Sequence, residues 1–285
     1  MQDGVIPETA RDMFEGAYPH EPARFAHQFA DHPLLTLDAL AKLAARMRPD
    51  TLEHNAAIDV PLGTPTGALQ PNGLTTLQTI ERIDSCGSWV LLREIEQDPV
   101  YAALMREVLG EVRPIVEKRT GPMHKLRAFV FISSPQAVTQ PHFDPEYNIL
   151  FQIKGAKTMT LFPTADTEIV GQRFFESYFT GGQRYLPWRD EHAARGMPIR
   201  IVPGESIFVP IFAPHHVKVH EDVSVSLSLT WCSDWCFEHI DAHKFNRRLR
   251  RIGLRPAAPR LYPGGNRLKS IGQRVLERLQ RPAVR

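Results

Sequence analysis

The chain has 285 residues, with 34 lysines and arginines, 32 acidic residues and a hydrophobic content of 42%. That length suits one large domain or two small ones, and no apolar run has the length of a membrane span. Three cysteines are too few for a disulfide framework, and residues 1–16 lack the apolar centre of a secretory signal. We therefore expect a cytoplasmic globular protein.

The net charge of +2 conceals an asymmetry. From His239 onward there are 13 lysines and arginines against Asp241 and Glu277, a net of +11, which leaves −9 for the preceding residues. A basic tail attracts anionic partners such as nucleic acid, although solvated arginine-rich helices are also common. Nucleic-acid contact is an open but not the favoured interpretation.

Residues 1–118 indicate a mixed, largely helical region that packs on a barrel. Residues 32–47 carry apolar side chains at helical spacing, with Thr36 as the expected N-cap. The next expected elements are a loop over 61–73, a strand over 88–96 and a helix over 99–119 that is broken at Pro114.

Between Leu126 and Cys232 the apolar pattern changes from helical spacing to alternation. Short β-type runs such as "LRAFVFISS", "NILFQIKG" and "VSVSLSLTW" are separated by Gly, Pro, Asp or Ser. Such runs indicate an antiparallel sandwich or jelly-roll barrel, which we place over 119–235. Residues 164–198 lack alternation and are expected to form an insertion that walls a site.

Residues 236–285 return to helical spacing, with a break over 255–265. The last helix should carry one apolar face, made of Leu268, Ile271, Val275 and Leu279. We expect that face to dock either on the barrel or on a second subunit, which would make the protein a homodimer.

A pair of residues that precedes the strand "NILFQIKG" suggests a metal site. His142 and Asp144 are two residues apart, so on an extended segment they point to the same side. A third ligand is offered by His215 or His216, which follow the apolar run "SIFVPIFAP". Two histidines and one carboxylate form the facial triad that suits non-haem Fe(II). A surface His and Asp in a polar loop is the alternative.

These motifs together resemble a known family. "HFD" at 142–144, "NILFQIKGAKTMTLFP" and "PGESIFVPIFAPHHV" are similar to the cupin-type JmjC dioxygenases, and in particular to the asparaginyl hydroxylase that inhibits hypoxia-inducible factor. The resemblance covers about 126–232. It implies a double-stranded β-helix flanked by N-terminal and C-terminal helices, and a need for Fe(II), O₂ and 2-oxoglutarate.

The resemblance also implies roles for individual residues. His142, Asp144 and His215 match the iron ligands, which leaves His216 a structural role. Lys157 matches the lysine that binds the distal carboxylate of 2-oxoglutarate; Lys154 is its rival, but the two have opposite parity on a strand. The cosubstrate contacts implied in addition are Thr139 and Asn148, with Thr230 at a position where the hydroxylase has asparagine.

The implied activity is oxidation of a C–H bond with release of succinate and CO₂. Hydroxylation of a protein side chain or small molecule is favoured over demethylation by the likeness to the hydroxylase. Two other classes stay open: a cupin enzyme that does not use 2-oxoglutarate, and a non-catalytic regulator whose basic tail binds nucleic acid. A zinc site formed by Cys232, Cys236, His239 and His243 is disfavoured, because four ligands along one helix cannot surround a metal.

Overall fold

Two antiparallel sheets form the core of the structure, a computed structural model that describes residues 4–58, 60–64, 68–183 and 185–280. A seven-stranded sheet has the order β1-β9-β6-β11-β4-β3-β2, and a four-stranded sheet has the order β5-β10-β7-β8. The strands are β1 (Ala23–Ala26), β2 (Leu52–Ala56), β3 (Ser88–Arg93), β4 (Met123–Ser133), β5 (Val138–His142), β6 (Tyr147–Lys154), β7 (Lys157–Leu161), β8 (Met197–Ile201), β9 (Glu205–Val209), β10 (His215–Val219) and β11 (Ser224–Ser233).

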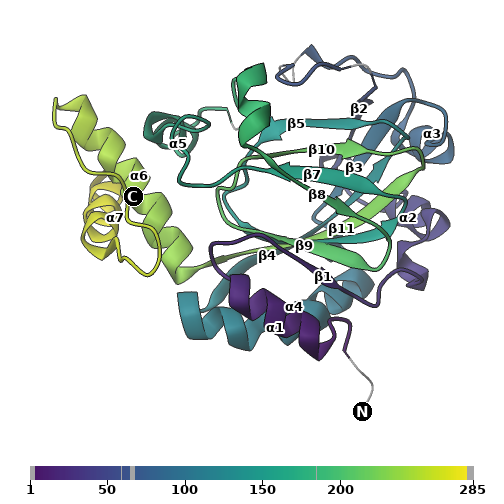
Figure 1. The fold of residues 1–285 in the computed structure, drawn as a ribbon, viewed down its shortest axis with the longest axis horizontal. Coiled ribbons are helices and arrows are strands. Elements are labelled where there is room, and N and C mark those ends of the chain that lie inside the picture. Colours follow the sequence, from purple (N-terminus) through teal and green to yellow (C-terminus); the bar gives the residue numbers. More distant parts are fainter. Residues whose placement is uncertain (1–3, 59, 65–67, 184, 281–285) are drawn as a thin grey trace, which may run out of the picture.

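The two sheets face each other and enclose a common interior (Figure 1). One apolar cluster contains Leu150 of β6, Ile207 of β9, Met159 of β7 and Val217 of β10, so it joins the two sheets. The expected jelly-roll barrel is thus confirmed.

Alternation along β11 separates the interior of the barrel from a second core. Its odd-numbered residues, from Val225 to Trp231, belong to the cluster that includes the apolar face of α4 (Pro99–Thr120) and Phe14 of α1 (Glu8–Ala17). Figure 1 shows α1 and α4 lying across the outer face of the large sheet. The even-numbered residues, from Ser224 to Thr230, therefore face the interior.

Helix α4 corrects one expectation, because it continues through Pro114 to Thr120. A proline inside a helix removes one hydrogen bond and crowds the carbonyl of the residue four positions earlier. That residue is Gly110, which is exposed like Pro114, so water can solvate its carbonyl. The opposite face buries Val108, Val112 and Val116 completely, and this apolar packing holds the helix together.

The N-terminal region supplies strands β1, β2 and β3 to the large sheet, together with several short helical segments. Thr36 caps α2 (Leu37–Ala44) through a 3.2 Å hydrogen bond from the Ala39 amide, as expected. The other helical elements are η1 (Pro33–Leu35), η2 (Pro49–Thr51), α3 (Thr76–Glu81) and η4 (Ile95–Gln97). The three-part division of the chain stays a prediction.

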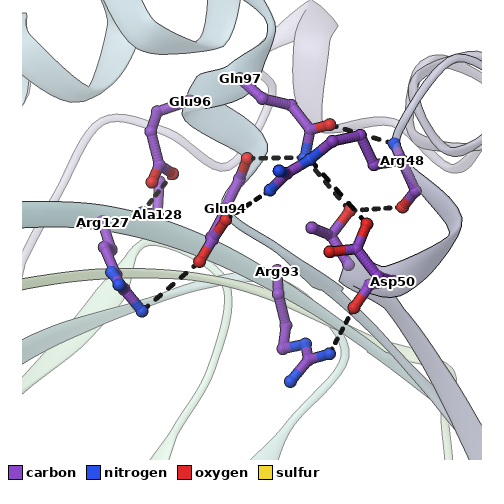
Figure 2. A network of polar contacts seen from close by, with 9 residues as sticks. Arg48, Asp50, Arg93, Glu94, Glu96, Gln97, Arg127 and Ala128 are labelled. Carbon is purple, nitrogen blue, oxygen red and sulfur yellow. Dashed lines mark hydrogen bonds and ion pairs between the residues drawn. The ribbon is translucent and has the colours of Figure 1, made fainter.

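A polar network fixes the ends of β3 and β4 to this region (Figure 2). Glu94, which has a left-handed backbone with φ of 58°, lies between Arg48 at 2.8 Å and Arg127 at 3.5 Å. The Glu96 carboxylate accepts a 2.9 Å hydrogen bond from the Ala128 amide, and burial raises the pKa of Glu96. The network restrains the rim of the barrel, where Arg127 pairs with Thr230 of β11.

The insertion and the C-terminal region add the remaining helices. The insertion holds α5 (Gln172–Tyr178) and η5 (Asp190–Arg195), and the C-terminal region forms α6 (Asp234–Arg251) and α7 (Arg267–Gln280). In Figure 1, α6 and α7 lie at one end of the barrel with α5 beside α6. None of the described helices combines the length and apolarity that a membrane span requires.

The orientation of α7 overturns the expectation that its apolar face docks on the barrel. The buried side chains of α7 are Ser270 and Gln273. Ser270 donates a 2.7 Å hydrogen bond to Asp241 of α6, which turns this face of α7 towards α6. The apolar residues instead point to solvent, with exposed fractions of 87% for Leu268, 50% for Ile271, 48% for Val275 and 77% for Leu279. We call these four residues the α7 stripe.

Candidate metal centre

Three side chains converge at one end of the barrel. His142 ends β5, His215 begins β10, and the two residues are directly paired between the strands. Asp144 follows β5, and its Oδ2 lies 3.9 Å from Nε2 of His142 and 3.7 Å from Nε2 of His215. The three ligand atoms lie within 4.8 Å of one another. This donor set of two imidazoles and one carboxylate can hold a divalent metal from one side.

Hydrogen bonds orient both imidazoles. Nδ1 of His142 lies 2.7 Å from the carbonyl of Gln140, and Nδ1 of His215 lies 2.9 Å from the carbonyl of Ala213. A carbonyl can only accept, so each Nδ1 carries the proton and each Nε2 presents a lone pair to the centre. Such bonds fix the ring and the tautomer of a metal-ligating histidine.

Backbone geometry positions Asp144. Its carbonyl accepts a 3.0 Å hydrogen bond from the amide of Phe212, whose left-handed backbone has φ of 63°. Phe143, between the first two predicted ligands, is fully buried and packs against Phe175 and Tyr178 of α5, with ring centroids 4.9 Å apart in each case. The loop that carries the carboxylate is therefore held between the barrel and the insertion.

Lys157 points into the barrel, and Lys154 does not. Lys157 is 4% exposed and pairs with Val219 and Ile201, whereas Lys154 is exposed at the end of β6. No side chain or carbonyl of the described residues forms a hydrogen bond or ion pair with the Lys157 ammonium. Burial lowers the pKa of Lys157 to about 7. A buried cation without a counter-charge is costly, and an anionic ligand would remove that cost.

Other predicted cosubstrate residues share the interior face. Thr139 of β5 pairs with Val217, so it faces inward and is half-buried. Asn148 and Thr230 are paired on β6 and β11, and each is 5% exposed. Within the described structure the Thr230 hydroxyl is buried and has no hydrogen-bond partner. Asn148 accepts a hydrogen bond from Ser228.

The side chains of the two sites that the sequence disfavoured make other contacts. His216 packs on the other side of β10, where its ring lies 5.4 Å from that of Trp188 in the insertion and 6.1 Å from that of Phe162. Among the described residues, the triad is the one group of His, Cys, Asp or Glu with metal-binding geometry. The thiols of Cys232 and Cys236 both donate weakly to the carbonyl of Pro145 instead.

Several supporting residues escaped the sequence analysis. The carbonyls of Gln140 and Ala213 leave no sequence signal, because any residue supplies a carbonyl. The left-handed conformation of Phe212 could not be predicted either, since glycine and asparagine are the residues that indicate such a backbone in a sequence. Ser228 could have been found from the alternation of serines in "SVSLSLT", which already indicated a polar inner face.

The comparisons with known proteins concern the fold. The profile of the cupin-like domain family matches residues 89–234, while no curated protein sequence matches the chain. The ribosomal oxygenase YcfD of Escherichia coli has a similar structure, with 14% identity and a TM-score of 0.50 over 99% of this chain and 69% of that chain.

Two further structures of the same Escherichia coli protein are also similar. One has 14% identity and a TM-score of 0.51, over 95% of this chain and 68% of that chain. The other is a complex with cobalt and 2-oxoglutarate, with 16% identity and a TM-score of 0.50 over 97% of this chain and 68% of that chain. The particular likeness to the asparaginyl hydroxylase stays a prediction.

Proposed function

Because the chain belongs to the family of cupin-like domains, we propose that it is an Fe(II)- and 2-oxoglutarate-dependent oxygenase. It would hydroxylate a protein side chain or a small molecule with O₂ and release succinate and CO₂. The observation that carries the proposal is the combination of the triad with Lys157, a buried cation inside the same barrel. The structure of YcfD with cobalt and 2-oxoglutarate supports it as an analogy of fold.

The residues present fit an iron ion. His142, Asp144 and His215 would hold it, and their one-sided arrangement leaves the opposite side open to other ligands. When bound, Fe(II) supplies the redox chemistry that lets O₂ react with 2-oxoglutarate and a C–H bond. The chain contributes by holding both imidazoles in one tautomer through Gln140 and Ala213.

The interior also fits a dicarboxylate. Along β7, Lys157 lies four residues from Leu161, which pairs with His215, so about 13 Å separate their backbone positions. A lysine side chain and a five-carbon dicarboxylate can bridge that distance end to end. The Lys157 ammonium would neutralise the distal carboxylate, and the hydroxyls of Thr139 and Thr230 and the amide of Asn148 would orient the molecule.

Lys157 also separates the proposal from the alternatives. A cupin enzyme that does not use 2-oxoglutarate has no need for a buried cation deep in its barrel. A non-catalytic regulator has no need for three ligands that leave half of the metal open. The choice of hydroxylation over demethylation rests on the likeness to the hydroxylase and is part of the proposal.

The test is anaerobic addition of Fe(II) and 2-oxoglutarate, followed in the visible charge-transfer band of the chelate. The wild type should show the band, and should release succinate slowly when air is admitted. His142→Ala and Lys157→Ala should lose the band, while Lys154→Ala, which removes the exposed lysine at the end of the preceding strand β6, should keep it. If the wild type binds iron but gives neither band nor succinate, the protein is a different kind of cupin.

We also propose that the chain forms a homodimer through the α7 stripe. The protomer buries polar residues of α7 and exposes the apolar ones, which is the reverse of a helix that packs on its own domain. A two-fold axis brings the same patch of both copies together, so an apolar stripe without charges inside it can cover itself.

A further inference from the structure

A basic hollow of about 360 Å³ lies between the end of α5 and helices α6 and α7. Four cations of α6 line it, together with Phe179, which follows α5, and two glutamines of α7. The cations are Lys244, Arg247, Arg248 and Arg251, and the glutamines are Gln273 and Gln280. Its volume falls within the range of roughly 300–1,000 Å³ that is usual for small-ligand pockets.

The charges in this hollow are not balanced. Among its described lining residues the carboxylate is that of Glu277, which pairs with Lys244 at 3.5 Å. None of the described acidic residues forms an ion pair with Arg247, Arg248 or Arg251. Three guanidinium groups therefore line the hollow without a direct ion pair among the described residues, and Glu277, which already pairs with Lys244, is the carboxylate that acts on Arg248.

Neutral oxygens hold two of these guanidinium groups in place. Arg248 donates to the side-chain carbonyls of Gln273 and Gln280, each at 3.0 Å, and Arg247 donates to the main-chain carbonyl of Glu176 at 3.2 Å. These contacts fix position without removing charge. Arg251 is exposed and completes the row within little more than one turn of α6.

We propose that this hollow binds the phosphodiester backbone of a single-stranded nucleic acid such as RNA. Guanidinium groups bind phosphate through paired hydrogen bonds, and several of them close together suit consecutive phosphates. Phe179 lines the hollow beside the arginines and is half-buried, since its ring packs on those of Tyr178, Phe212 and His243, and its remaining exposed surface can contact a base. The net charge of +11 after residue 238 adds long-range attraction.

The geometry of α7 favours RNA over a lipid surface. A helix that lies on a membrane inserts its apolar side and keeps its cations at the same surface. At about 100° per residue, Gln273 and Gln280 lie nearly opposite the α7 stripe. The hollow and the stripe therefore face different directions, and an RNA strand and a second subunit could be bound together.

The hollow is also close to the metal centre. The ring of Phe179 packs on that of Phe212 at 5.5 Å, and the Phe212 amide is bonded to Asp144. RNA in the hollow would thus lie one layer of packed side chains from the loop that carries the carboxylate ligand. The RNA site does not depend on the proposed oxygenase activity and can be measured without metal.

The experiment measures binding of a labelled single-stranded RNA of about 16 nucleotides to the full chain by fluorescence anisotropy, between about 50 and 200 mM salt. The variant Arg247→Gln/Arg248→Gln/Arg251→Gln should bind at least about tenfold more weakly, and the slope of log affinity against log salt should fall by about two. The matched control Arg106→Gln/Arg113→Gln/Lys118→Gln on α4 removes the same charge and should lose less than about threefold.

The single variant Arg251→Glu guards against misfolding, because the Arg251 side chain is exposed and forms no hydrogen bond or ion pair with the residues that the structure describes. It should keep the wild-type thermal unfolding curve and still weaken RNA binding. If the triple arginine variant of the hollow and the α4 control lost RNA affinity equally, the proposal would be overturned, since net charge alone would then explain binding. The proposal would also be overturned if the protein bound anionic vesicles or polyglutamate but not RNA, and if the variant Arg247→Gln/Arg248→Gln/Arg251→Gln lost that binding.

Discussion

The hydroxyl of Ser228 donates a 2.7 Å hydrogen bond to Oδ1 of Asn148 between neighbouring strands β11 and β6, inside the barrel. This bond commits the amide oxygen, so the Asn148 NH₂ group is left to donate towards the interior. An amide held in this way can contact a carboxylate without first paying the entropy of orientation.

We expect Ser228→Ala to raise the KM for 2-oxoglutarate by roughly three- to tenfold, because one hydrogen bond contributes about 1 kcal/mol. The value of kcat at saturating cosubstrate should change little. The control is Ser206→Ala, which removes an equally buried hydrogen bond, to the Phe25 carbonyl, on the outer face of the large sheet. Equal KM values for both variants would contradict a positioning role for Ser228.

Binding of 2-oxoglutarate should depend on pH through Lys157. Burial lowers the pKa of this lysine to about 7, whereas the dicarboxylate requires the ammonium form. Affinity should therefore fall about tenfold per pH unit above pH 7, and binding at pH 8 should take up nearly one proton. Calorimetry in buffers of different ionisation enthalpy measures that uptake.

Lys157→Met should abolish both the proton uptake and the pH dependence, and Lys154→Met should leave them intact. Stability of the unliganded protein should change in the opposite sense. Between pH 7 and about 10.4 the unfolded chain binds the proton that folded Lys157 has lost, so the free energy of unfolding should rise with pH across that window. Lys157→Met should lack this rise.

The two adjacent histidines of β10 should differ sharply in metal binding. We expect His215→Ala to weaken Fe(II) or Co(II) binding by more than about 100-fold, since even the loss of an outer-shell partner costs 10–100-fold. His216→Ala should bind metal as the wild type does, because its ring packs on Trp188 on the other side of the strand. Titration followed by the Co(II) absorption spectrum distinguishes the two.

The contact between the insertion and α6 should stabilise the fold measurably. The Glu176 carboxylate is buried and accepts one bifurcated hydrogen bond from the N–H of Arg250 Nε, which lies 3.0 and 3.1 Å from its two oxygens. Arg250→Ala would leave a buried charge unpaired, and should lower the free energy of unfolding by about 3–5 kcal/mol. Lys42→Ala, which breaks the exposed pair with Asp38, should cost no more than about 0.5 kcal/mol in urea denaturation.

Replacing the centre of the α7 stripe should dissociate the dimer. Ile271→Glu/Val275→Glu introduces like charges across a two-fold axis, and sedimentation velocity should show a monomer with an unchanged circular dichroism spectrum. Met13→Glu/Val100→Glu alters two residues that are equally exposed elsewhere, and should stay dimeric. A wild-type protein that is monomeric at high concentration would rule out this role for the stripe.

The sequence predicted the barrel well because its signals are local and repeated. Alternation in "SVSLSLTW" specifies which side of β11 is buried against helices and which faces inward, whatever the remaining chain does. The spacing of His142 and Asp144 was informative for the same reason. Parity favoured Lys157 over Lys154 on the assumption of a single strand, but Lys154 ends β6 in the large sheet and Lys157 begins β7 in the small sheet, so parity along one strand does not decide between them.

Other features depend on contacts that alternation does not encode. Helix α4 passes through Pro114 because burial of three valines outweighs one lost hydrogen bond. The direction of α7 is set by polar contacts with Asp241, so the amphipathic pattern identified the stripe but did not decide between the barrel and a second subunit as its neighbour. The restraint on Asp144 comes from the left-handed backbone of Phe212, which the identity of this residue does not predict.

The serines on the inner face of β11 have a cost as well as a use. Ser224, Ser226 and Ser228 occupy positions where a filled jelly roll would place valine or leucine, and they bury little apolar surface. The fully buried side chain of Gln152 contacts two of them, donating to Ser224 at 3.0 Å and accepting from Ser226 at 2.6 Å. The inner face of β11 thus gives up apolar burial for hydrogen bonds that fix two buried amides, and valines in place of these serines would leave the amides of Gln152 and Asn148 without those partners.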